Sequence, residues 1–96
     1  MMGFHLIQTY ERLSDLGLLR SKRHFSRLLG HHWSYLRDVE QRDNDEFRVP
    51  QATVERLRTH LQALTHFLPS RTAAEIEQVI ARIDQHTSVA GLLARR

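Results

Sequence analysis

Segment 21–40, SKRHFSRLLGHHWSYLRDVE, constrains the fold more than any other part of the chain. Apolar residues recur at helical spacing before and after Gly30, and Ser21 is a residue type that caps helix N-termini. Glycine tolerates the positive φ that a tight turn between two helices needs. The segment therefore predicts two short helices joined by a turn, the second beginning near His32 or Trp33. The residues expected to face inward are Phe25, Leu28, Leu29, Leu36 and Val39.

Apolar spacing predicts further helices on both sides of this pair. A first helix covers residues 4–16, with Leu6, Ile7, Tyr10 and Leu13 on one face and Gly17 as the left-handed residue that ends it. Residues 41–49 are polar and aperiodic, which predicts a loop whose Phe47 and Val49 fold back onto the core. The chain shows no strand alternation, so we expect an all-α protein.

The C-terminal half has two apolar stripes. Pro50 suits the first turn of a helix, and Val54, Leu57, Leu61, Leu64 and Leu68 follow at spacings of 3 and 4. Ser70 can cap a helix over residues 71–85, and residues 88–96 form a short sixth helix or a loose end. The stripe of this helix either packs on the core or forms a dimer interface; we favour the interface, because β-branched side chains beyond what a core of this size needs are typical of self-association. Its residues are Ile76, Val79, Ile80 and Ile83.

Composition excludes several classes of protein. The 96 residues allow one domain, and the absence of cysteine excludes disulfides and thiolate sites. No signal peptide or membrane-spanning run is evident, so we expect a cytoplasmic protein that does not contact a membrane. The seven histidines lack paired-ligand spacing. We therefore expect no metal, no cofactor and no enzymatic activity.

Charge is segregated along the chain although the net charge is only +3. Residues 20–37 contain five basic residues and no acid, whereas residues 38–46 contain five acids and one arginine. A helix pair that packs on one side and is basic on the other is suited to polyphosphate binding. A solvated helix face would show the same pattern, and Trp33 could equally be a partly buried core residue.

The joint spacing resembles the lambda-repressor-like helix-turn-helix family of bacterial and phage regulators, also called the XRE family. The resemblance covers residues 6–64 and implies a five-helix helix-turn-helix bundle, with residues 1–68 as the DNA-binding core and 69–96 as a C-terminal extension. Lys22 and Trp33 depart from it, because the family often has glutamine there. The matching residues are Ser21, Phe25-Ser26, Leu29-Gly30, Ser34, Leu36, Val39-Glu40, Pro50, Thr53 and Leu57.

The resemblance also implies which residues meet DNA. Residues at the start of the third helix would enter the major groove, and basic residues of the second helix would contact phosphate. Burial of Phe25, Leu29, Leu36 and Val39 must then push Trp33 and Arg37 into solvent. The candidate DNA-binding residues are Lys22, Arg23, Arg27, His32, Trp33, Ser34, Arg37 and Arg42.

These inferences predict a sequence-specific DNA-binding transcriptional regulator, most simply a small dimeric repressor that binds double-stranded DNA. The alternative is a protein-interaction module, such as an anti-activator or antitoxin-like adaptor, that has the same fold without DNA binding. The acidic segment after the basic one keeps this alternative open, because carboxylates near a DNA-facing surface repel phosphate.

Overall fold

Five helices make up the described part of the chain. The computed structural model describes residues 1–42 and 47–94, with side chains up to residue 87. The helices are α1 (Gly3–Asp15), α2 (Lys22–Leu28), α3 (Tyr35–Gln41), α4 (Gln51–Thr65) and α5 (Ser70–Ala94). Extended pairing within these residues is limited to one isolated bridge between Met2 and Arg48. The all-α prediction is confirmed, while Asp43, Asp45 and Glu46 of the acidic segment lie outside the described residues.

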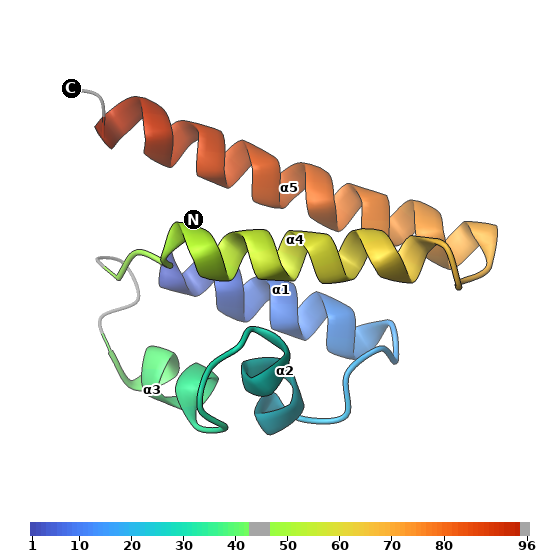
Figure 1. Cartoon of the computed structure of the whole chain (residues 1–96), viewed down its shortest axis with the longest axis horizontal. Coiled ribbons are helices and arrows are strands. Elements are labelled where there is room, and N and C mark those ends of the chain that lie inside the picture. Colours follow the sequence, from blue (N-terminus) through green and yellow to red (C-terminus); the bar gives the residue numbers. More distant parts are fainter. Residues whose placement is uncertain (43–46, 95–96) are drawn as a thin grey trace.

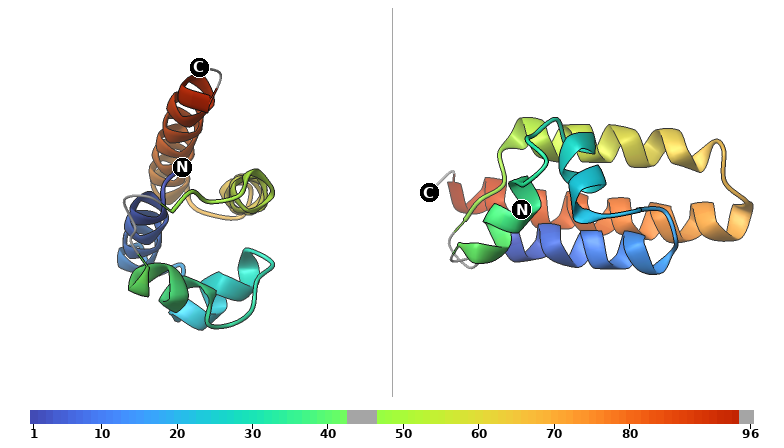
Figure 2. Two further views of the ribbon diagram at one scale, coloured as in Figure 1. Left: turned by 90° about the vertical axis from the view of Figure 1, so that its left-hand side faces the viewer. Right: turned by 90° about the horizontal axis from the view of Figure 1, so that it is seen from below.

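The helices surround one core. Figure 1 shows α4 between α5 and the short pair α2 and α3. Viewed end-on, α1, α4 and α5 run along the long direction of the molecule, and α2 and α3 lie across one side (Figure 2). Buried apolar residues from all five helices form a single cluster between them. The largest fully buried side chain in that cluster is Phe25 of α2.

The N-terminus and the α3–α4 connection hold each other in place. The Gly3 amide donates to the Phe47 carbonyl oxygen at 2.7 Å, and the Val49 amide donates to the Met1 carbonyl oxygen at 2.9 Å. Val49 is consequently buried and Phe47 packs against the core. The predicted return of these two side chains to the core is confirmed, by backbone pairing that the sequence pattern does not show.

Both predicted turn glycines have positive φ. Gly17 follows α1 with φ of 77°, and Gly30 follows α2 with φ of 83°. Ser21 caps α2 as predicted, because its Oγ accepts from the His24 amide at 3.2 Å. The predicted start of the next helix near His32 or Trp33 is wrong. It begins at Tyr35, because the chain completes its turn through residues 31–34 before its backbone becomes helical.

The C-terminal helix is longer than predicted and belongs to the core. Instead of ending near residue 85 ahead of a sixth helix or a loose end, α5 continues to Ala94. Its apolar stripe faces α1 and α4, and its four side chains are at most 9% exposed. These side chains are therefore unavailable for a dimer interface, and the prediction that placed one there is corrected. The stripe is Ile76, Val79, Ile80 and Ile83.

Polar and aromatic contacts join α5 to its neighbours. His5 of α1 stacks on His86 of α5, with ring centroids 3.6 Å apart. Arg58 of α4 pairs with Asp84 of α5 at 2.8 Å. Burial, then the nearby charge of His86, lowers the pKa of His5 to about 4. Both sides of α5 are thus tied to the rest of the chain.

Candidate nucleic-acid interface

Helix α2 has a buried face and a basic face. Phe25, Ser26 and Leu29 are buried, because they point at α3 and the core. Arg23 and Arg27, four residues apart on a helix, share the opposite side and are exposed. Helical periodicity alone therefore separates apolar packing from positive charge on this short element.

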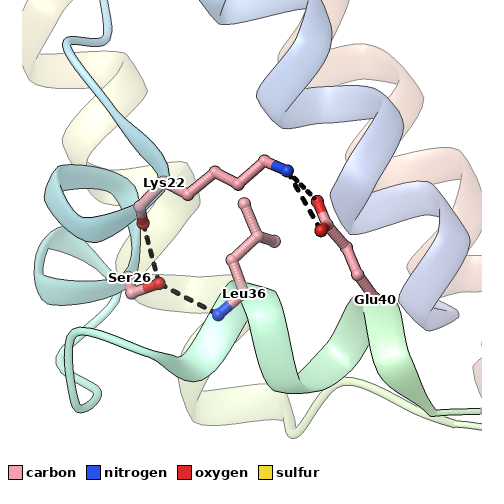
Figure 3. A network of polar contacts seen from close by, with 4 residues as sticks. All are labelled: Lys22, Ser26, Leu36 and Glu40. Carbon is pink, nitrogen blue, oxygen red and sulfur yellow. Dashed lines mark hydrogen bonds and ion pairs between the residues drawn. The ribbon is translucent and has the colours of Figure 1, made fainter.

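Ser26 connects α2 to α3. Its hydroxyl donates to the Lys22 carbonyl oxygen at 2.8 Å and accepts from the Leu36 amide at 3.0 Å (Figure 3). Leu36 lies in the first turn of α3, where amides have no partner within their own helix. Ser34, the residue before α3, makes no capping bond with its side chain. A serine of the neighbouring helix thus performs that role and sets the position of α3 against α2.

Lys22 is already paired with an acid. Its Nζ lies 2.9 Å from Oε1 and 3.0 Å from Oε2 of Glu40, so the pair joins the start of α2 to α3 (Figure 3). The hydrogen bond to Glu40 raises the pKa of Lys22. Any phosphate contact by Lys22 would require exchange of this carboxylate for a phosphate oxygen.

Trp33 lies on the surface, not in the core. Its side chain is 44% exposed, and the guanidinium carbon of Arg23 is 4.7 Å from its ring centroid. This cation–π contact connects the turn to the outer face of α2. The His32 ring is tilted beside Trp33, with centroids 5.1 Å apart. Arg23, His32 and Trp33 therefore form one exposed group.

Residues at the start of α3 are linked by short polar contacts. His32 Nδ1 lies 3.0 Å from Ser34 Oγ, which donates to Asp38 Oδ2 at 3.4 Å. Arg37 and Asp38 are exposed on α3. The expected geometry holds, because Phe25, Leu29, Leu36 and Val39 are all buried while Trp33 and Arg37 face solvent.

Arg42 lies apart from this group, at the C-terminus of α3. Its guanidinium carbon is 5.4 Å from the centroid of the Phe47 ring, and its side chain is exposed. The structure therefore brings together Arg23, His32 and Trp33 directly, and it places Arg27 and Arg37 on the adjoining helices.

The sequence pattern did not identify the contacts that hold the turn in place. His31 Nε2 lies 2.7 Å from Thr53 Oγ1 of α4, and the His31 ring stacks on Tyr35 with centroids 3.8 Å apart. Burial, then the charge of Arg56, lowers the pKa of His31. His31 and Thr53 are 22 residues apart, so no local spacing could have found this pair. The one local indication that this position helps to hold the turn is that a histidine directly follows the turn glycine.

Other site types are not seen in the described residues. No group of three or more metal-ligating side chains is present in the described part of the chain. None of the helices, as far as they are described, is long and apolar enough to cross a bilayer. The chain matches no family model, and no curated protein or solved structure is significantly similar to it.

Proposed function

We propose that this protein is a sequence-specific DNA-binding transcriptional regulator, most simply a repressor that occludes a promoter. The observation that carries the proposal is the exposed surface made by the outer side of α2, the following turn and α3. Arg23, Arg27 and Arg37 lie on it, and none has an ion-pair partner among the described residues. Three guanidinium groups without an ion-pair partner in that part of the chain lie near an exposed tryptophan. This combination favours a nucleic acid as the partner, because its phosphates carry negative charge and its base edges accept hydrogen bonds.

Different parts of this surface have different roles in the proposal. Arg37, the exposed His32 and Trp33, and the half-buried Ser34 face the bases in this proposal, where a bidentate arginine–guanine pair is worth about 1–3 kcal/mol. Arg23 and Arg27 contact phosphates on one flank, and Arg42 contacts the backbone on the other. Lys22 contacts phosphate in this proposal only if a phosphate oxygen replaces the Glu40 carboxylate as its partner.

The first experiment measures DNA affinity before any operator is known. A mixed-sequence duplex should bind with a dissociation constant of about 10⁻⁴–10⁻⁶ M at physiological salt, and it should be retarded by micromolar protein at low salt, because affinity falls steeply as salt rises. Bound duplexes selected from a random pool then supply the preferred sequence. Absence of retardation at tens of micromolar protein would exclude DNA binding.

Two arginine variants test the assignment of the surface. Arg37→Ala should weaken binding to the selected duplex about 5- to 150-fold and relax preference at one base pair. Arg71→Ala is the matched control, because Arg71 is exposed at the start of α5, away from α2 and α3. Equal affinity and equal sequence preference for Arg37→Ala and the control would refute the assignment.

A protein-interaction module remains the second candidate, and one observation favours it. The Lys22–Glu40 pair places a carboxylate on the same surface, and Asp38 adds another on the exposed side of α3. Mixed charge of this kind suits a protein partner better than a phosphate backbone. The mixed-sequence retardation experiment separates the two functions.

A homodimer also remains a prediction. Two copies would protect two half-sites whose centres lie about 34 Å, one helical turn, apart. The dimer contact would have to use a surface other than the buried stripe of α5. Sedimentation of the free protein and footprint length on the selected duplex measure the two quantities directly.

A further inference from the structure

A basic hollow lies between α2 and α4, beside the surface proposed to bind DNA. Its volume is about 590 Å³, and its lining includes Arg20, Arg23, Arg27, His24 and His60, with Leu28 among them. Arg23 and Arg27 are four residues apart and share one face of α2, and Arg20 reaches the same hollow from the segment just before the helix. His60 contributes from α4. The sequence pattern did not connect these residues, because His60 is 33 or more positions from the arginines.

Within the described residues, no acidic side chain balances the charge of this hollow. No carboxylate lines it. Arg20, Arg23 and Arg27 have no ion-pair partner among the described residues, whereas Arg12, Lys22 and Arg58 each pair with an acid. Three guanidinium groups around one concavity repel each other unless an anion lies between them. The hollow therefore has the charge pattern of an anion-binding site.

A second hollow limits where the anion can lie. It adjoins the basic one, because both are lined by Leu28 and His60, and it continues along α4 to Glu55 and Arg56. At that end the exposed Glu55 carboxylate offsets the positive charge of the exposed Arg56, whereas the lining at the arginine end contains no acid. The favourable position is consequently at the arginine end, between α2 and His60.

We propose that this hollow binds a small anion with two or more phosphoryl groups, such as a polyphosphate or the phosphate chain of a nucleotide. Arginine forks bind phosphate oxygens in pairs, so three of them match several phosphoryl groups better than one. The proposal does not depend on DNA binding, although Arg23 and Arg27 are common to both surfaces.

Tryptophan fluorescence provides a direct measurement. Trp33 is the single tryptophan of the chain, and Arg23 lies over its ring while also lining the hollow. Inorganic tripolyphosphate should therefore change Trp33 emission in a saturable manner, and isothermal titration calorimetry should give the same affinity. Sulfate at matched ionic strength should bind at least about tenfold more weakly, because it has one anionic centre. Equal affinity for sulfate would overturn the proposal.

Matched variants locate the site. Arg20→Gln and Arg27→Gln should each weaken tripolyphosphate binding about tenfold, the effect of one lost charge-assisted contact. Arg71→Gln should have no effect, and circular dichroism should show unchanged helix content in all three. Unchanged affinity in both hollow variants, or an equal loss in Arg71→Gln, would refute the site. Arg37→Gln distinguishes the two proposals, because it should weaken DNA binding and leave tripolyphosphate binding unchanged.

Discussion

The hydroxyl of Ser26 is the most informative atom to remove from this structure. It is fully buried, and it accepts a hydrogen bond from the amide of Leu36 at the start of α3. Ser26→Ala keeps the small size that close packing of α2 and α3 requires, and it deletes only this oxygen. The Leu36 amide is then left without its partner in a position that water does not reach.

The expected loss of stability follows from that amide. A buried donor without a partner costs about 1–3 kcal/mol, whereas alanine regains a few tenths of a kcal/mol through its higher helix propensity. We therefore expect Ser26→Ala to lower the free energy of unfolding by about 1–2.5 kcal/mol. For a domain of this size the melting temperature should fall by about 5–15 °C.

Urea and thermal unfolding, followed by circular dichroism, measure this loss. Ser14→Ala is the control, because Ser14 is exposed in α1 and its substitution deletes a hydroxyl without orphaning a buried amide. It should leave the urea midpoint unchanged or raise it slightly. A Ser26→Ala midpoint equal to that of the control would show that α3 does not depend on the Ser26 contact.

Three further predictions test the pH response, the core and the turn. Burial lowers the pKa of His5 from 6.5 to about 4 in the folded protein. As the pH drops from about 6.5 to 4, His5 is therefore protonated in the unfolded chain but not in the folded one, and the free energy of unfolding falls. After allowance for the partial exposure of His5, the expected loss in the free energy of unfolding is about 1–2 kcal/mol. Urea unfolding of the wild type and of His5→Asn at several pH values in that range measures it, because the variant should lack this loss. Ile83→Ala should lower the free energy of unfolding by about 2–5 kcal/mol, and the loss should not depend on protein concentration, because Ile83 is buried within one chain. A loss that depends on protein concentration would instead indicate that Ile83 lies in a dimer interface. Gly30→Ala and Gly17→Ala should each cost about 1–2 kcal/mol, because the two glycines have φ of 83° and 77°. The Arg56 guanidinium near the Gly30 Cβ position is the end of a flexible, exposed side chain that can move aside. An unchanged urea midpoint in both variants would refute the requirement for positive φ at these turns.

Much of the fold was predictable because its signals are local. Gly17 and Gly30 end helices, and Ser21 begins one, through backbone preferences that act within a few residues. Apolar spacing found the inner faces of α2 and α4. The same reasoning misplaced the start of α3, because residues 31–34 are held in a turn by contacts with distant parts of the chain.

The candidate DNA surface was predictable only in outline. Its exposed arginines and Trp33 follow from the burial of the opposite helix faces. The pairing of Lys22 with Glu40 joins residues 18 apart, and it depends on how α2 and α3 cross. The basic hollow needs α4 beside α2, so no spacing within either helix reveals it.

The α5 stripe shows most clearly where periodicity stops being informative. A row of apolar side chains at helical spacing predicts that one face of the helix is buried, but it does not predict which element or partner covers that face. Packing against α1 and α4 covered it within the chain.

The sequence by itself determined helix content, the helix ends at Gly17, Ser21 and Gly30, and the separation of apolar from basic faces, because these depend on neighbours within one or two turns. Only the tertiary structure decided which faces meet, which charges are paired and where unpaired arginines gather. Helix contacts and charge pairing depend on the angles and distances between helices. These arise from packing of the whole core, so no single segment of the sequence predicts them.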